Sequence, residues 1–207
     1  CSLAMALLIG AVIRVALQQA PIIVELPELE PISVFPDFAS ITDVDEKKRQ
    51  FFDFIENYVD SENEKILQVR SELEPLAGMA AAGTPFSAIE RGAILELAEL
   101  YRLDVEQFSI AELVLELMRR VDVIPPSLVL AQAANESAWG TSRFTLEGNN
   151  LFGQWCFIEG CGIVPNRRRS GAKHEVKSFD SVASAVSSYF LNLNTHQSYD
   201  YLRDLRV

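Results

Sequence analysis

The sequence has few residues of the kinds that bind metal ions or nucleic acids. Two histidines and three cysteines occur among 207 residues, and they are too scattered for zinc-finger or zinc-protease spacing. Lysine and arginine number 18 against 29 acidic residues, which gives a net charge of −11. Because phosphate binding needs clustered basic residues, no broad nucleic-acid surface is expected. No metal ion or other cofactor is predicted.

The negative charge is concentrated in the first part of the chain. Residues 1–122 contain 22 acidic and 10 basic residues, whereas residues 123–207 contain seven and eight. Hydrophobic residues make up 49% of the sequence, so the chain is expected to fold around an apolar core. The difference in charge predicts that the two parts of the chain have different functions.

A short apolar run opens the sequence. Residues 3–13 are 11 residues without a charge, which suits the core of a signal peptide better than a membrane-spanning helix of about 20 residues. Extended to residue 24 across Arg14, the run suits a short membrane anchor. We predict that residues 1–24 form a signal or anchor segment in the inner membrane, which places the protein in the periplasm or cell envelope. The alternatives are a cleaved signal peptide, a lipid-modified Cys1 and an ordinary buried helix.

The other two cysteines agree with an oxidising compartment. Cys156 and Cys161 lie five residues apart in a glycine-rich stretch, where a tight disulfide can form. The alternative is a pair of reduced, partly buried thiols. Two cysteines alone supply too few ligands for a metal ion.

Proline content and apolar spacing organise the chain up to residue 121. Four prolines in residues 21–40 predict an extended linker, bounded at 25–42. Apolar residues then recur every three or four positions, the period of an amphipathic helix. An acidic helical support region is therefore predicted over residues 43–121. Its helices are expected over residues 43–76, 88–101 and 104–121, with Ser109 as an N-cap of the last.

The remaining residues, 122–207, are predicted to form a second domain. Pro125 and Pro126 can open a helix, and the segment that follows is almost wholly apolar, which is typical of a buried helix. Alternating residues and a turn further on indicate a small β-hairpin. The expected elements are a helix over 127–137, a hairpin between 163–164 and 174–179, a helix over 181–194 capped by Asp180, and a short helix over 199–207.

One carboxyl group in this domain has the surroundings of a general acid. Glu136 lies at the end of the apolar helix, where neighbours such as Ala133 and Ala134 supply no positive charge. Apolar surroundings and the negative end of a helix both disfavour the ionised form of a carboxyl group. A protonated carboxyl can donate its proton to a departing sugar oxygen. The alternative is a glutamate that turns outward and hydrogen-bonds a loop.

The residues around Glu136 resemble a family signature. The segments AQAANESAWGTSRF and EGNNLFG contain the pattern A-x-x-E-S-x-W-G, then a serine, then N-L-F-G. This pattern is similar to that of the bacterial peptidoglycan N-acetylglucosaminidases, the glucosaminidase-type autolysins, and the wider chain resembles their Bax-like subgroup. The resemblance implies a mainly α fold, with a lysozyme-like helical lobe, a small β-hairpin lobe and, in this chain, an N-terminal helical extension. It also implies that Glu136 is the general acid.

Several side chains are predicted to bind the sugar chain. Flat aromatic rings can cover the apolar faces of sugars or pack beneath Glu136. A side-chain amide can hydrogen-bond an N-acetyl group. The resemblance also implies a tyrosine on a helix that faces the cleft. In each case the alternative is a structural role, either in the core or in holding a loop by backbone hydrogen bonds. The candidates are Trp139, Asn150, Phe152, Trp155 and Tyr189.

Glycoside hydrolysis usually needs a second carboxylate, which acts as base or nucleophile. Glu175 is the first choice because it lies on a predicted strand that can face the cleft. Glu159 and Asp180 are the other candidates. A substrate-assisted route through the substrate's own N-acetyl oxygen needs no second acid.

A basic run, Arg167, Arg168 and Arg169, occupies the predicted hairpin turn. It is interpreted either as a solvated turn or as a contact for carboxylates of peptide stems or other anionic polymers of the envelope. The two histidines, His174 and His196, are interpreted as surface or capping residues.

These observations predict a peptidoglycan hydrolase that binds glycan strands and cleaves the β-1,4 bond after N-acetylglucosamine. Glu136 is its general acid and Glu175 its second carboxylate. One alternative is a muramidase or lytic transglycosylase, which cuts the other glycosidic bond. Another is a non-catalytic peptidoglycan-binding scaffold.

Overall fold

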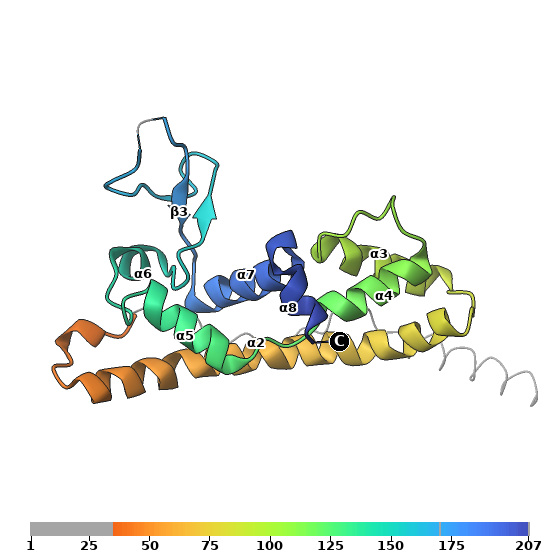
Figure 1. Cartoon of the computed structure of the whole chain (residues 1–207), viewed down its shortest axis with the longest axis horizontal. Helices are drawn as coiled ribbons and strands as arrows, with labels where there is room; N and C mark the ends of the chain where they lie inside the picture. Colours follow the sequence, from red (N-terminus) through yellow and green to blue (C-terminus); the bar gives the residue numbers. More distant parts are fainter. Residues whose placement is uncertain (1–34, 170, 207) are drawn as a thin grey trace, which may run out of the picture.

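A computed structural model describes residues 35–169 and 171–206 (Figure 1). The predicted signal or anchor segment, residues 1–24, lies outside the described residues, as do residues 25–34 of the predicted linker. Among the residues that are described, no helix is both long and apolar enough to cross a membrane.

The described chain is mainly α-helical and carries one small sheet, as predicted. A helical lobe and a small β-lobe form the lysozyme-like arrangement that the resemblance implies. The elements are η1 (Phe38–Ser40), α2 (Val44–Ala81), α3 (Ala88–Leu100), α4 (Ile110–Arg120), α5 (Pro126–Glu136), α6 (Arg143–Gly148), β1 (Trp155–Cys156), β2 (Gly162–Ile163), β3 (Glu175–Lys177), α7 (Val182–Thr195), η2 (Gln197–Tyr199) and α8 (Asp200–Asp204).

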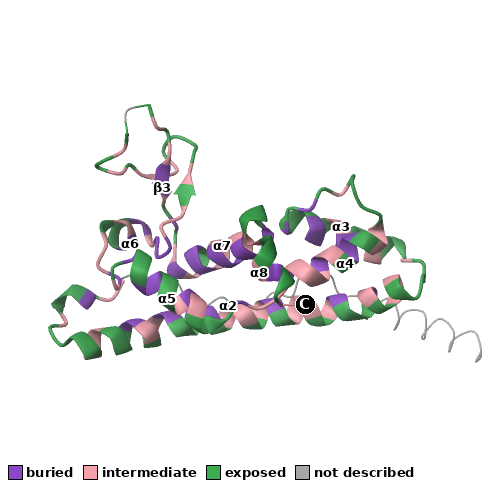
Figure 2. Cartoon of the chain, in the orientation of Figure 1, coloured by how far each residue is buried: buried purple, intermediate pink, exposed green. Residues whose placement is uncertain are grey.

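The long helix α2 supports both parts of the chain. It begins after Asp43, whose carboxylate accepts a hydrogen bond from the Glu46 N–H, and it continues past the predicted end to Ala81. Helices α4, α5 and α7 all contact it, and Figure 1 shows them lying along one side of it. Their apolar side chains are buried in one continuous core (Figure 2). The predicted support region and the predicted second domain therefore share a core.

The segment just before α2 is folded rather than extended. Asp37 caps η1 by accepting hydrogen bonds from the N–H groups of Ala39 and Ser40. Phe38 is fully buried, with its ring centroid 5.4 Å from that of Phe51. The linker predicted from proline content over 25–42 is therefore wrong for residues 35–42, because burial of an aromatic side chain fixes this part of the chain.

Serine caps set the starts of three helices. Ser87, Ser109 and Ser181 each form a capping box at the beginning of α3, α4 and α7, which satisfies backbone N–H groups that have no partner inside the helix. Ser109 is the predicted cap, and α4 accordingly begins six residues later than the predicted helix. The prediction that Asp180 caps α7 is wrong, because Ser181 accepts the hydrogen bond from the Ser184 N–H.

The β-lobe is a three-stranded antiparallel sheet in the order β1-β3-β2. The predicted hairpin is present, with Ile163 of β2 opposite Val176 of β3. Strand β1, which pairs Cys156 with Glu175, was not predicted, because two residues are too few to show an alternating pattern. In Figure 1 the lobe projects from the helices beside α6.

Candidate active site

Glu136 reaches the solvent from the last turn of α5. Val129 and Ala133, one helical repeat apart, are fully buried on the side where α5 packs against α2. Glu136 itself is exposed, and its Oε1 accepts a hydrogen bond from Nδ2 of Asn135 at 3.3 Å. The prediction that the whole helix is buried is therefore wrong: one face packs, and the carboxyl group stands outside the core.

An unusual turn follows Glu136. Ala138, Trp139 and Gly140 have φ angles of 52°, 57° and 75°, a left-handed conformation that residues with a Cβ rarely adopt. The buried Oγ of Ser137 accepts a hydrogen bond from the Gly140 N–H at 2.8 Å. A Cβ at position 140 would lie 2.6 Å from the Phe38 ring, so this position requires glycine. The turn brings α6 next to the end of α5.

Trp139 fastens this turn to α2. Its ring centroid lies 5.7 Å from that of Phe51 and 5.2 Å from that of Phe52, both in edge-on geometry, and Nζ of Lys48 lies 5.6 Å from the ring centroid. These contacts favour the structural alternative for Trp139 over sugar binding. The residue positions Glu136 indirectly, because it fixes the turn that leaves α5.

Asn150 is fully occupied with its own loop. Its side chain is 1% exposed. The amide nitrogen donates to the carbonyl oxygens of Gln154 and Lys177 at 2.9 and 2.8 Å, and the amide oxygen accepts from the N–H groups of Phe152 and Gln154 at 3.3 and 3.0 Å. No polar position is left for an N-acetyl group, so this geometry does not support the predicted substrate contact.

The Glu136 carboxylate lies at the N-L-F-G loop, and its charge reaches Tyr189 on α7. A Cβ on Gly153, whose φ is +63°, would lie 3.3 Å from Oε2 of Glu136. Burial raises the pKa of Tyr189 to about 12, and the nearby Tyr199 and Glu136 add to the rise. The Tyr189 phenol therefore keeps its proton at neutral pH and can donate a hydrogen bond beside the carboxylate.

Phe152 and Tyr189 form one side of this site. Their rings are stacked, with centroids 4.1 Å apart and an interplanar angle of 3°, and both side chains are buried. Phe152 thus uses a ring face on Tyr189 rather than on a sugar. Tyr189 is close enough to Glu136 for the carboxylate charge to add to the rise in its pKa.

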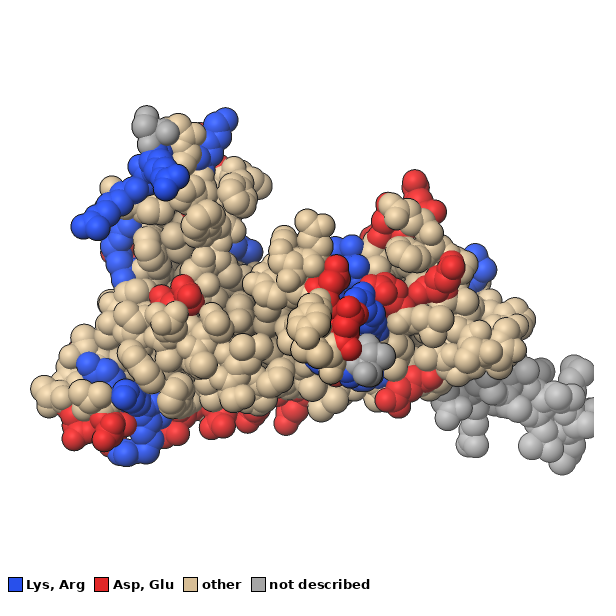
Figure 3. Space-filling model, viewed as in Figure 1, with Lys and Arg blue, Asp and Glu red and all other residues tan. Residues whose placement is uncertain are grey.

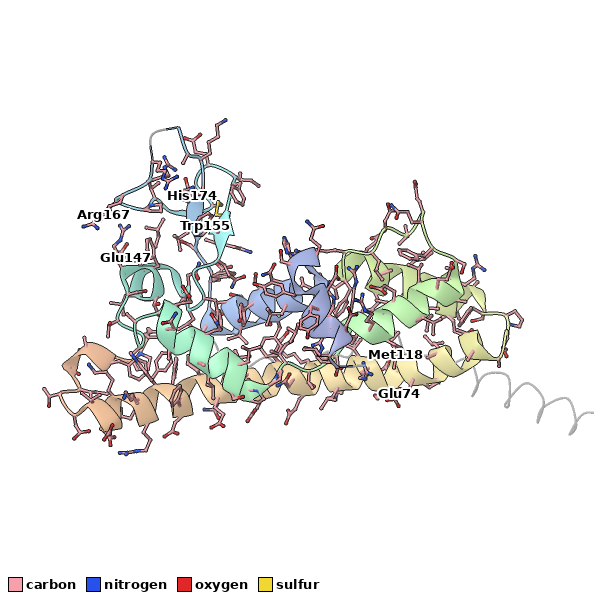
Figure 4. The ribbon with its side chains drawn as sticks, in the orientation of Figure 1. Glu74, Met118, Glu147, Trp155, Arg167 and His174 are labelled. Atoms are coloured by element: carbon pink, nitrogen blue, oxygen red, sulfur yellow. A yellow bond between two sulfur atoms is a disulfide. The ribbon has the colours of Figure 1, made fainter. Side chains whose placement is uncertain are left out.

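Trp155 is the candidate aromatic that remains open to solvent. Its side chain is 58% exposed, and it stacks on the His174 ring with centroids 4.3 Å apart and an interplanar angle of 16°. Figure 4 shows the two rings together on the β-lobe. The sequence does not indicate this pairing, because 18 residues separate two rings that the β1–β3 register brings together. An exposed, supported indole is suited to stacking on a sugar ring.

Glu175 faces the inside of the β-lobe. It is buried, and its two carboxylate oxygens accept hydrogen bonds from the N–H groups of Gly160 at 3.2 Å and Gly162 at 2.9 Å. The loop that it holds is closed by the disulfide between Cys156 and Cys161, the pairing expected from the sequence. This geometry gives Glu175 a structural role and does not support the predicted role as second acid. Glu159, on the same loop, is exposed.

Comparisons with known proteins agree with this description. Residues 111–206 match the glucosaminidase family, described as mannosyl-glycoprotein endo-beta-N-acetylglucosaminidase. This match confirms the resemblance that the signature around Glu136 indicates. The chain is also 31% identical over 175 residues to Protein bax of Escherichia coli (strain K12), an alignment that covers 84% of the chain and 61% of that protein. No solved structure matches the chain.

Proposed function

We propose that the protein is a peptidoglycan hydrolase that cleaves the β-1,4 bond after N-acetylglucosamine, with Glu136 as general acid. One observation carries the proposal. Within the part of the chain that matches the glucosaminidase family, the signature glutamate is exposed, and its carboxylate lies beside Gly153 of the N-L-F-G loop. A carboxyl group in this position is open to a sugar chain while its backbone is fixed by the core.

In the proposed reaction, Glu136 protonates the oxygen of the glycosidic bond as that bond breaks. Sugar rings that cover the carboxyl group exclude water from it, and loss of water favours its protonated form. Trp155 stacks on a neighbouring sugar ring, and the Tyr189 hydroxyl donates a hydrogen bond at the site. Water then adds to the anomeric carbon, which completes hydrolysis.

The proposal gives Glu175 no part in proton transfer, because its two oxygens already accept backbone hydrogen bonds. Three candidates for the second group follow from the predictions: Glu159 and Asp180, which are both exposed, and the substrate's N-acetyl oxygen. A carboxylate that activates water inverts the anomeric centre, whereas a carboxylate nucleophile or the N-acetyl oxygen retains it. NMR of the first product from wild type gives the stereochemistry, and loss of rate in Glu159→Gln or Asp180→Asn identifies a carboxylate.

We further propose that the protein works in the periplasm or cell envelope, held at the inner membrane by residues 1–24. The disulfide between Cys156 and Cys161 supports an oxidising compartment. The proposed substrate lies in the same compartment.

The test compares Glu136→Gln with wild type on purified peptidoglycan, with mass spectrometry of the fragments. We expect a loss of rate of at least about a hundredfold, the scale of a general acid, and an unchanged melting temperature, since the side chain is exposed. Glu147→Gln is the matched control, an exposed glutamate on α6, and it is expected to keep the wild-type rate.

The products also separate the alternatives. N-acetylglucosamine at the new reducing end supports the proposal. N-acetylmuramic acid indicates a muramidase, and an anhydro end indicates a lytic transglycosylase. A wild type that binds peptidoglycan without cleaving it, with Glu136→Gln indistinguishable from it, indicates a scaffold.

A further inference from the structure

The β-lobe differs in charge from the rest of the molecule. Residues 153–179 contain five basic residues and two acidic ones, a net charge of +3, so the rest of the chain carries −14. One of the two acids, Glu175, is buried, which leaves the surface of the lobe more basic still. Figure 3 shows basic side chains over the projecting lobe and acidic ones along the helices.

The basic residues at the far end of the lobe are not neutralised by acidic side chains of residues 35–169 or 171–206. Among the described residues, the salt bridges involve none of Arg167, Arg168, Arg169 and Lys173. In the helical lobe, by contrast, Arg119, Arg120 and Arg203 pair with acidic side chains of their own lobe. The positive charge of the β-lobe is therefore free to meet an anion from outside.

These basic side chains border the exposed aromatic platform. Nη1 of Arg168 donates to the carbonyl oxygen of His174 at 3.3 Å, and the His174 ring supports Trp155. Figure 4 shows Arg167 extending from the lobe on the side above α6, where Glu147 lies. Glu147 is itself 4.0 Å from a guanidinium nitrogen of Arg143, so its charge is partly compensated there.

We propose that the basic end of the β-lobe, Arg167, Arg168, Arg169 and Lys173, recognises the free carboxylates of the peptide branches on peptidoglycan strands. The inference rests on the proposed function and specifies its substrate as glycan that still carries its peptides. A guanidinium binds a carboxylate through two parallel N–H bonds, which gives orientation as well as attraction. Because the branches sit on every second sugar, a strand that stacks on Trp155 presents carboxylates to the neighbouring arginines.

The experiment measures binding of the full chain to immobilised glycan strands, with and without their peptide branches. The branches are removed with an amidase that cleaves the bond between sugar and peptide, and the lactyl carboxylates that this hydrolysis frees are then amidated. All proteins carry Glu136→Gln so that the strands stay intact. The test variant is the pair Arg167→Glu and Arg169→Glu. The pair Lys47→Glu and Arg49→Glu is the matched control, because it makes the same change in charge with the same spacing on the first turns of α2.

We expect about tenfold tighter binding to branched than to stripped strands, the scale of a few surface ion pairs, and weaker discrimination at high salt. The 167/169 pair is expected to lose the discrimination while its binding to stripped strands stays unchanged, and the 47/49 pair to keep it. Equal binding to both strands by the starting protein overturns the proposal. An equal loss of discrimination in both charge-reversed pairs also overturns it, because that result is an effect of net charge. Arginine-dependent binding to anionic lipid vesicles, without any preference between the strands, overturns it as well.

The outcome is independent of whether Glu136 is the general acid. The assay measures binding and requires no hydrolysis. If Glu136→Gln retains full activity, the proposed function fails in its catalytic residue, and the preference for branched strands is then measured from the association phase on ice, before the strands are cut. If the preference is missing but Glu136→Gln is inactive, the further inference alone fails.

Discussion

The two lobes of this protein are held together by different means. The helical lobe buries a continuous apolar core that joins α2, α4, α5 and α7. The β-lobe buries little besides Glu175, Val176 and Phe179, and its loop is held by a disulfide and by hydrogen bonds to one carboxylate. It also leaves large apolar side chains exposed, among them Phe157 and Ile158.

This difference separates two tasks. The carboxyl group proposed for the chemistry stands on a helix that the large core positions, which suits a group whose placement must be accurate. The exposed rings and the arginines without an ion pair to any described residue stand on a small lobe with few packing constraints, which suits contact with a varied polymer. The acidic helices and the basic lobe also give an anionic polymer one preferred side of approach.

The largest expected effect comes from removing an aromatic ring from the core. Phe51 is fully buried and touches the rings of Phe38, Phe52 and Trp139. Phe51→Ala is expected to lower the free energy of unfolding by about 3–5 kcal/mol. Phe157→Ala, at a side chain that is 71% exposed, is expected to change it by less than about 0.5 kcal/mol. Urea unfolding checks both, and similar losses would contradict the contrast between the lobes.

The next effect concerns the disulfide and is expected to stay local. Replacing both Cys156 and Cys161 by serine frees a short loop, which costs roughly 2 kcal/mol in the chain-entropy estimate. Because the lobe shares little of the core, that cost is expected to appear as faster hydrogen exchange at the Gly160 and Gly162 amides, which bond Glu175. The amides of α2 are expected to exchange as before. Faster exchange throughout both lobes would show that the lobes unfold as one unit.

A third effect depends on pH and tests whether Tyr189 is buried in the core of the helical lobe. Burial raises the pKa of Tyr189 to about 12, while an unfolded chain loses the phenol proton near pH 10. Above pH 10 the unfolded state therefore binds fewer protons than the folded state, so stability falls as the pH rises toward 12. At pH 11 this amounts to about 1 kcal/mol from Tyr189.

The measurement is urea unfolding at pH 8 and pH 11 for wild type, Tyr189→Phe and Tyr201→Phe. Tyr189→Phe is expected to lose about 1 kcal/mol less than wild type between the two values. Tyr201, which is 73% exposed, serves as the control and is expected to follow wild type. If the free energy of unfolding of Tyr189→Phe fell as much as that of wild type, the Tyr189 phenol would not be held in the buried site.

Periodicity and signature predicted much of the helical lobe. Apolar residues three and four apart are enough to place α2, α3 and α7, because a packed helix must bury one stripe. The signature led to Glu136, and the wider resemblance led to Tyr189, whose pKa the Glu136 charge helps to raise. Ser109 was found because a serine with a glutamate three residues later is a local signal.

The β-lobe was harder to predict because its contacts are not local. The direction of Glu175 depends on a loop that returns 13 residues earlier in the chain, and the stacking of His174 on Trp155 depends on a register between two very short strands. The sequence left both roles of Trp139 open for a related reason. Its direction follows from a left-handed turn, and residues other than glycine give no sign of such a turn in the sequence.

That turn gives the smallest of these effects. Ala138 has φ 52°, a conformation that costs a residue with a Cβ about 1–2 kcal/mol and that glycine adopts freely. Ala138→Gly is therefore expected to raise the free energy of unfolding by about 0.5–1 kcal/mol. Ala131→Gly, on the exposed side of α5, is expected to lower it by a similar amount because glycine weakens a helix interior. Thermal unfolding distinguishes opposite signs readily, and a loss in both variants would mean that Ala138 is not strained in this turn.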